Sequence, residues 1–150
     1  MDTQKIKIKQ VENTTAGKIF HVASEYAVND NVVVEFAQET KPYRGKVFAA
    51  VQANVGDISK YCAGTAAKLI KEGYTGYLIR TTNDEKTGNG SNAENILRAE
   101  RENKQIAKEL GFTDVYNLYN CQHRLHDRSL LEVSARFIFI FRALKVDTVL

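Results

Sequence analysis

The middle of the chain alternates between a continuous apolar run and a helical pattern. Residues 46–53 (KVFAAVQA) are almost entirely apolar, which is typical of a strand covered on both faces of its sheet. From Ala63 to Glu72 the apolar side chains recur at helical spacing, and Gly73 is expected to end that helix in the left-handed conformation. Residues 54–61 are expected to form a loop and residues 74–81 a second strand. This order predicts a right-handed parallel strand-helix-strand crossover.

The second half of the chain repeats this alternation. Residues 82–92 (TNDEKTGNGSN) are rich in turn-forming residues and predict a long exposed loop. The elements expected after it are a helix capped by Ser91 or Asn92 and ended by Gly111, a strand at 114–118, a polar loop at 119–128, a helix from Leu130 to Leu144 capped by Ser129, and a strand at 146–150. The whole pattern predicts an α/β fold over residues 46–150: a three-layer, Rossmann-like sandwich with a mostly parallel sheet that stops at its fourth strand.

Residues 1–45 carry a different pattern. Short apolar alternations, such as Ile6 with Ile8 and then Val32–Val34, are separated by turns that contain Asn, Thr and Gly. They predict a β-rich, antiparallel N-terminal segment. The residues from Thr40 to Gly45, which include the only proline, form the expected connector to the α/β domain.

Two of the predicted helices contain residues that a simple apolar stripe does not explain. Glu100 and Asn103 interrupt the stripe of the helix after the long loop, and our interpretation is a solvated helix with paired charges such as Glu100 and Lys104. In the last helix, Phe137–Phe141 make the surface apolar almost all round. A helix that is apolar on every side belongs in a core or an interface.

Composition and charge exclude several classes of function. The 21 Lys and Arg residues exceed the 18 Asp and Glu residues by a net charge of only +3 without any basic run, which argues against a nucleic-acid partner. The chain shows no leader and no apolar stretch near the length of about 18 residues that spans a bilayer, so we expect a cytoplasmic protein without a membrane partner. Cys62 and Cys121 lack CxxC spacing, and we expect buried thiols rather than a disulfide.

Candidate chemistry lies where the predicted strands end, because ligands of open α/β sheets bind at the carboxyl ends of the strands. The loop after the first strand contains one acid, Asp57, and no histidine. Asn83 and Asp84 follow the second strand, and His123 and His126 lie in the loop after the third. We therefore expect these four residues to line a pocket at that edge of the sheet.

Common catalytic and cofactor-binding motifs are missing. No GxGxxG, GxxxxGK[ST] or GxSxG occurs, so the dinucleotide, P-loop and hydrolase-elbow interpretations lack their motifs. Gly64 and Thr65 begin a predicted helix and either present N–H groups to an anion or reflect close packing of that helix on the sheet. His123 and His126, with Asp127 adjacent, either bind zinc or are ordinary surface histidines of a polar loop.

The stretch VFAAVQANVGDISKYCAGTAAKLIKEGYTGYLIRTTNDE resembles the opening of the PIG-L/LmbE family of zinc-dependent N-acetylglucosaminyl deacetylases. In that family a first strand runs into an (A/P)H-x-D-D-x-(E/P) loop, which is followed by a Gly-Thr helix, a glycine, and a second strand that ends in a Thr-(Asp/Asn)-rich loop. The helix from Asn95 to Leu110 is similar to the family's Arg/Glu-rich helix, and the resemblance covers about residues 45–150. It implies a Rossmann-like fold, a zinc cofactor and a substrate with a sugar or another N-acetyl group.

The chain departs from the family in the residues that carry the chemistry. Alignment through residues 62–65 places Asn54 at the metal-binding histidine, Gly56 at the general base and Asp57 at the metal-binding aspartate. The chain also ends before the region that brings the family's last histidine. A catalytic zinc takes about three protein ligands, and general base catalysis is typically worth about 10²- to 10⁴-fold, so we expect zinc binding and hydrolysis to be lost.

Three hypotheses follow. The first is a relative of the deacetylases that has their fold but no catalytic residues, which makes it a pseudoenzyme with Asp57 as the one surviving metal position. The second is a non-catalytic binding or assembly module whose exposed sheet edge and apolar helix contact another copy of the chain or a carboxyl-terminal partner segment. The third is an enzyme of another type that uses His123, His126 and Asp127.

Overall fold

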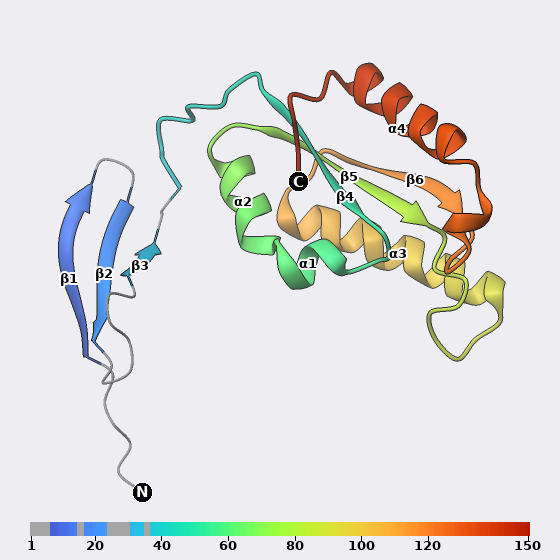
Figure 1. Cartoon of the computed structure of the whole chain (residues 1–150), viewed down its shortest axis with the longest axis horizontal. Helices are drawn as coiled ribbons and strands as arrows, with labels where there is room; N and C mark the ends of the chain where they lie inside the picture. Colours follow the sequence, from blue (N-terminus) through green and yellow to red (C-terminus); the bar gives the residue numbers. More distant parts are fainter. Residues whose placement is uncertain (1–6, 15–16, 24–30, 35–36) are drawn as a thin grey trace, which may run out of the picture. The chain divides into compact units, whose positions relative to one another are not determined.

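The computed structural model describes residues 7–14, 17–23, 31–34 and 37–150. The chain divides into two compact units, Met1–Ala37 and Gln38–Leu150 (Figure 1). Gln38 belongs to the second unit, where its backbone N–H donates to the carboxylate of Glu72 at 3.0 Å.

The first unit is a three-stranded antiparallel sheet. Its strands, in the order β1-β2-β3, are β1 (Lys7–Thr14), β2 (Gly17–Ala23) and β3 (Asn31–Val34). A register shift interrupts the pairing of β1 with β2 between Gln10 and Glu12. The prediction of an antiparallel β segment is confirmed for these strands, whereas Ile6 lies outside the described residues.

The second unit is built on a four-stranded parallel sheet in the order β6-β5-β4-β7. Its elements in chain order are β4 (Val47–Gln52), α1 (Asp57–Tyr61), α2 (Ala63–Lys71), β5 (Thr75–Thr82), α3 (Asn92–Leu110), β6 (Asp114–Asn120), the 3₁₀ helix η1 (Leu125–Asp127), α4 (Leu130–Leu144) and β7 (Thr148–Val149). Helices α1, α2 and α3 lie on one face of the sheet and α4 on the other (Figure 1). The predicted three-layer, Rossmann-like α/β fold is confirmed.

The continuous apolar run of β4 follows from its place in the middle of this sheet. Phe48 and Ala50 point to the side of α1, α2 and α3, while Ala49 points to the side of α4, and all three are fully buried. Leu78 and Ile79 of β5 divide between the two faces in the same way. Because a parallel strand with helices on both sides has no solvated face, alternation is lost from its sequence.

Several helix ends follow from sequence signals in the neighbouring residues. Ser91 begins α3 with a capping box, in which its hydroxyl accepts from the Glu94 N–H and the Glu94 carboxylate accepts from the Ser91 N–H. Gly111 ends α3 with φ 84°, and Gly73 follows α2 with φ 105°. Ser129 is the N-cap of α4 as expected, but its side chain makes no capping hydrogen bond.

Several sequence-based expectations were wrong. Residues 54–61 are not all loop, because α1 spans Asp57–Tyr61. The exposed loop after β5 begins with buried residues, since Asn83 is 8% exposed and Asp84 is fully buried. Close packing does not explain Gly64, because a Cβ atom added there would meet nothing within 4 Å.

Two expectations from composition concern the whole chain. Cys62 and Cys121 are free thiols, as expected, but both are half-buried rather than buried. In the part of the chain that the structure describes, no helix is both long enough and apolar enough to cross a bilayer.

Candidate functional site

The candidate site lies at the carboxyl ends of three neighbouring strands. Asn54 follows β4, Asn83 and Asp84 follow β5, and Gln122 follows β6. The three strands are parallel and adjacent, so the segments that leave them meet at one edge of the sheet.

The carboxylate of Asp57, which was the expected metal ligand, is hydrogen-bonded to the turn just before it. Its Oδ2 accepts a hydrogen bond of 2.9 Å from the backbone N–H of Asn54, and the residue is the first of α1. Gly56 precedes it with φ 90°, a left-handed conformation that residues with a side chain rarely adopt. The turn is completed by the Ser59 hydroxyl, which donates to the Gly56 carbonyl at 2.9 Å.

Asn54, which stands at the family's histidine position, is held by two donors. Its Oδ1 accepts from the Thr82 hydroxyl at 3.1 Å and from Nε2 of Gln122 at 3.1 Å. Gln122 is buried and its Nε2 also donates to the Thr87 hydroxyl at 2.7 Å. The amide of Asn54 therefore links the ends of β4, β5 and β6. Gln122 was not among the site residues predicted from the sequence.

Asp84 is the central acid of the site. Its carboxylate accepts from Nη1 of Arg80 at 3.0 Å and from the backbone N–H of Val55, whose nitrogen is 3.2 and 3.1 Å from the two oxygens. The side chains of Arg80 and Asp84 are both completely buried. Burial raises the pKa of Asp84 and outweighs the hydrogen bonds from Val55 and Arg80, which lower it.

A buried layer of amides continues from Arg80 under α3. Arg80 Nε donates to Oδ1 of Asn117 at 3.0 Å, and Nε2 of Gln52 donates to Oδ1 of Asn103 at 2.6 Å. Gln52 also accepts the backbone N–H of Ile58 at 3.2 Å, which ties α1 to the end of β4. The interpretation of Asn103 as part of a solvated face was therefore wrong, because it is fully buried.

The other residues of the expected pocket divide into two groups. Asn83 joins the network, since its Oδ1 accepts from the backbone N–H of Gln122 at 3.3 Å. His123 and His126 lie on the surface, and His126 Nε2 is 3.2 Å from a carboxylate oxygen of Asp127 with 79% of the side chain exposed. His123 has a left-handed backbone with φ 61°.

The donor set at this edge does not fit a zinc ion. Asp57 is a single carboxylate that already accepts a backbone N–H, and Asn54 offers a neutral amide oxygen that already has two donors. Among residues 37–150 and the described parts of β1–β3, no group of three or more His, Cys, Asp or Glu side chains is placed to hold a metal. Zinc in proteins takes nitrogen, sulfur and carboxylate ligands, usually at least three.

Comparisons with known proteins identify the fold. No family model matches the chain, and no curated protein matches it with significance. Among solved structures it is similar to the N,N'-diacetylchitobiose deacetylase from Pyrococcus horikoshii, with TM-score 0.65 and 22% identity over 75% of this chain and 43% of that chain. It is also similar to GalB, the 4-carboxy-2-hydroxymuconate hydratase from Pseudomonas putida KT2440, with TM-score 0.62 and 18% identity over 69% of this chain and 45% of that chain.

These likenesses define a class of fold. The second unit is an α/β domain of the kind found in the deacetylase, and the chain spans less than half the length of either solved structure. At identities below a quarter, the likeness establishes the fold and leaves the activity to be argued from the site.

Proposed function

We propose that this protein is a non-catalytic relative of the PIG-L/LmbE deacetylases, with their fold and without their zinc-dependent hydrolysis. The observation that carries the proposal is the use of the site's polar groups. Asn54 and Asp57, which align with the family's metal-binding positions, each accept hydrogen bonds from neighbouring protein groups, and so does the buried Asp84 near them. Because these acceptors are already hydrogen-bonded to the protein, we interpret this edge of the sheet as a structural support rather than a reaction centre.

The chemistry of hydrolysis explains why the substitutions matter together. An amide is hydrolysed by water that loses a proton to a general base, and Gly56 has no side chain to accept it. Asp84 does not supply the base, because its carboxylate is sealed from solvent and accepts from Arg80 and Val55. The chain therefore lacks both the metal ligands and the general base that this reaction needs.

Acetate release tests the proposal. The full chain is incubated with N,N'-diacetylchitobiose and with N-acetylglucosamine in the presence of added zinc, beside the Pyrococcus horikoshii deacetylase as a positive control. We expect no acetate above the level of a protein-free sample. Zinc-dependent acetate release that disappears in Asp57→Asn would contradict the proposal.

The ligand proposed for the site is a sugar or another N-acetyl compound that is bound and not cleaved. Its support is the fold likeness together with the half-buried Asn54 and Asp57, which lie just after the carboxyl end of β4. Saturation-transfer NMR with N-acetylglucosamine measures such binding directly. We expect a signal that Asn54→Leu removes, whereas equal signals from both proteins would contradict this ligand.

An assembly module is the second candidate function. It is favoured by the outer side of α4, where Leu131 is 80% exposed and Phe139 is 75% exposed. Large apolar side chains gathered on one exposed surface mark interaction sites.

A further inference from the structure

Exposed apolar side chains gather on helix α4. Within residues 37–150, no other helix or strand carries more than one exposed Leu, Ile, Val or Phe, whereas α4 carries four. They are Leu130, Leu131, Ile138 and Phe139. Large apolar side chains that stay in water together on one element mark an interaction surface.

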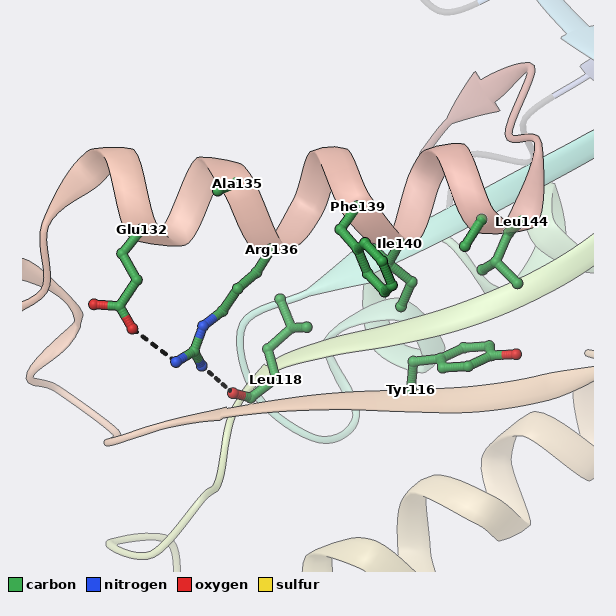
Figure 2. A pocket seen from close by; sticks show the side chains of 9 residues that line it. Tyr116, Leu118, Glu132, Ala135, Arg136, Phe139, Ile140 and Leu144 are labelled. Carbon is green, nitrogen blue, oxygen red and sulfur yellow. Dashed lines mark hydrogen bonds and ion pairs between the residues drawn. The ribbon is translucent and has the colours of Figure 1, made fainter.

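The apolar surface of α4 continues into a groove between α4 and β6 (Figure 2). The groove has a volume of about 570 Å³, and its walls include Phe139 and Ala135 of α4 and Leu118 of β6. Arg136 lies at one end, where it donates to the Leu118 carbonyl at 3.2 Å and to Glu132 at 2.7 Å. The surface is therefore apolar along its length and charged where it ends.

Exposed basic residues stand at both ends of α4. Arg124 and Arg128 precede the helix, and Arg142 and Lys145 lie at its carboxyl-terminal end. Residues 121–145 contain five Lys or Arg residues and two acids, a net charge of +3 that equals the net charge of the whole chain. The remaining residues contain 16 charges of each sign. The positive excess of the sequence therefore falls in α4 and the loop before it.

This charge distinguishes between the occupants that an apolar surface can take. A second copy of the chain brings two surfaces of net positive charge together, and like charges across an interface weaken binding. An anionic bilayer has the complementary chemistry, with negative headgroups outside and hydrocarbon beneath them. Each Lys or Arg near such a bilayer strengthens binding about fivefold. A helix that lies in the bilayer interface buries its apolar side about 5–10 Å deep and keeps its basic residues at the headgroups.

We propose that α4 is a membrane-docking helix and that the occupant of its exposed side is the surface of a bilayer containing anionic lipids such as phosphatidylserine. Leu131, Ile138 and Phe139 enter the interface, and Arg142 and Lys145 contact the headgroups. This docking needs no spanning helix, so it revises the expectation of no membrane partner, which rested on the length of the apolar stretches. The inference is independent of the proposed loss of zinc-dependent hydrolysis.

A single tryptophan reports on this surface, because the chain contains none. Phe139→Trp keeps an aromatic side chain at the exposed position, and Leu97→Trp is the matched control at an exposed position of α3, on the other face of the sheet. In the full chain we expect Phe139→Trp to emit as a water-exposed indole in buffer. Its emission should shift to shorter wavelength when vesicles of phosphatidylcholine and phosphatidylserine, in a ratio of about 2:1, are added, whereas that of Leu97→Trp should not shift.

Co-sedimentation of the full chain with vesicles measures the affinity. Binding to the mixed vesicles should be at least about tenfold tighter than to vesicles of phosphatidylcholine alone, and it should weaken as the salt concentration rises. Arg142→Glu should weaken binding by at least about fivefold. Lys108→Glu is the matched control, because both residues are the basic residue in the last turn of a helix but Lys108 lies on α3. It changes the net charge equally and should weaken binding much less.

Several results would overturn the proposal. Equal losses from Arg142→Glu and Lys108→Glu would show attraction through net charge without a defined surface. Emission of Phe139→Trp that is already shifted to shorter wavelength in buffer would show that a protein contact covers the position. No binding to the mixed vesicles, or equal binding to both kinds of vesicle, would also contradict it. Circular dichroism of each variant establishes that a loss of binding is not a loss of fold.

Discussion

Arg80 and Asp84 form an ion pair of 3.0 Å in which both side chains are completely out of solvent. The same carboxylate accepts the backbone N–H of Val55 in the loop after β4. The pair therefore fixes the end of β5 to the short loop between β4 and α1, which contains Asn54. Because the pair lies at the ends of the strands, it is part of the candidate site.

Removal of the Asp84 carboxylate is expected to destabilise the fold strongly. Asp84→Ala leaves the buried guanidinium of Arg80 without its counter-charge, and breaking a buried pair in this way typically costs about 3–5 kcal/mol. Urea unfolding of wild type and variant measures the difference. Asp127→Ala is the control, since the pair of Asp127 with Arg124 is exposed and screened by solvent and should contribute little to the free energy of unfolding. Equal effects of the two substitutions would show that burial does not set the strength of the Arg80–Asp84 pair.

Asn103 is expected to stabilise the fold from within α3. Asn103→Ala removes the acceptor for Gln52 Nε2, and an unsatisfied buried donor costs about 1–3 kcal/mol. Gln105→Ala, at an exposed position of the same helix, should change the free energy of unfolding by less than about 0.5 kcal/mol. Thermal or urea unfolding distinguishes the two, and a neutral Asn103→Ala would contradict the buried amide layer.

Asp147 makes the attachment of β7 dependent on pH. The Val47 N–H at 2.9 Å and the Lys46 ammonium at 3.1 Å hold the pKa of Asp147 below its ordinary value. A carboxyl group with a lowered folded pKa stabilises the fold above the unfolded value of about 3.9 and loses that effect as the pH falls through the folded pKa. The wild type should therefore be more stable than Asp147→Asn at neutral pH, and the difference in urea midpoint should shrink below about pH 4. A difference that stays constant with pH would contradict this role.

The features that were predictable from sequence have signals confined to a few neighbouring residues. The start and end of α3 follow from Ser91 with Glu94 and from Gly111. The apolar run of β4 predicts a strand buried on both faces, and the parallel sheet confirms it. Such signals depend on local backbone chemistry and burial, which the sequence shows directly.

The buried polar layer could not be predicted from such local signals. Gln52 and Asn103 each interrupt an apolar pattern, and only the tertiary fold brings them together across 51 positions. Arg80 has the residue type expected on a surface, and its burial depends on Asp84, which the sequence suggested was exposed. Periodicity indicates that a polar residue faces inward but does not identify its partner. α1 was missed because a helix of five residues has too little pattern to detect.

The zinc content of the purified full chain tests the central claim most directly. After dialysis against micromolar zinc and then metal-free buffer, we predict less than about 0.1 zinc per chain, because Asn54 and Asp57 do not provide the three or so ligands that a zinc site needs. Asp57→Asn serves as the control for zinc held elsewhere on the surface and should give the same low value. One zinc per wild-type chain that is lost in Asp57→Asn would contradict the account.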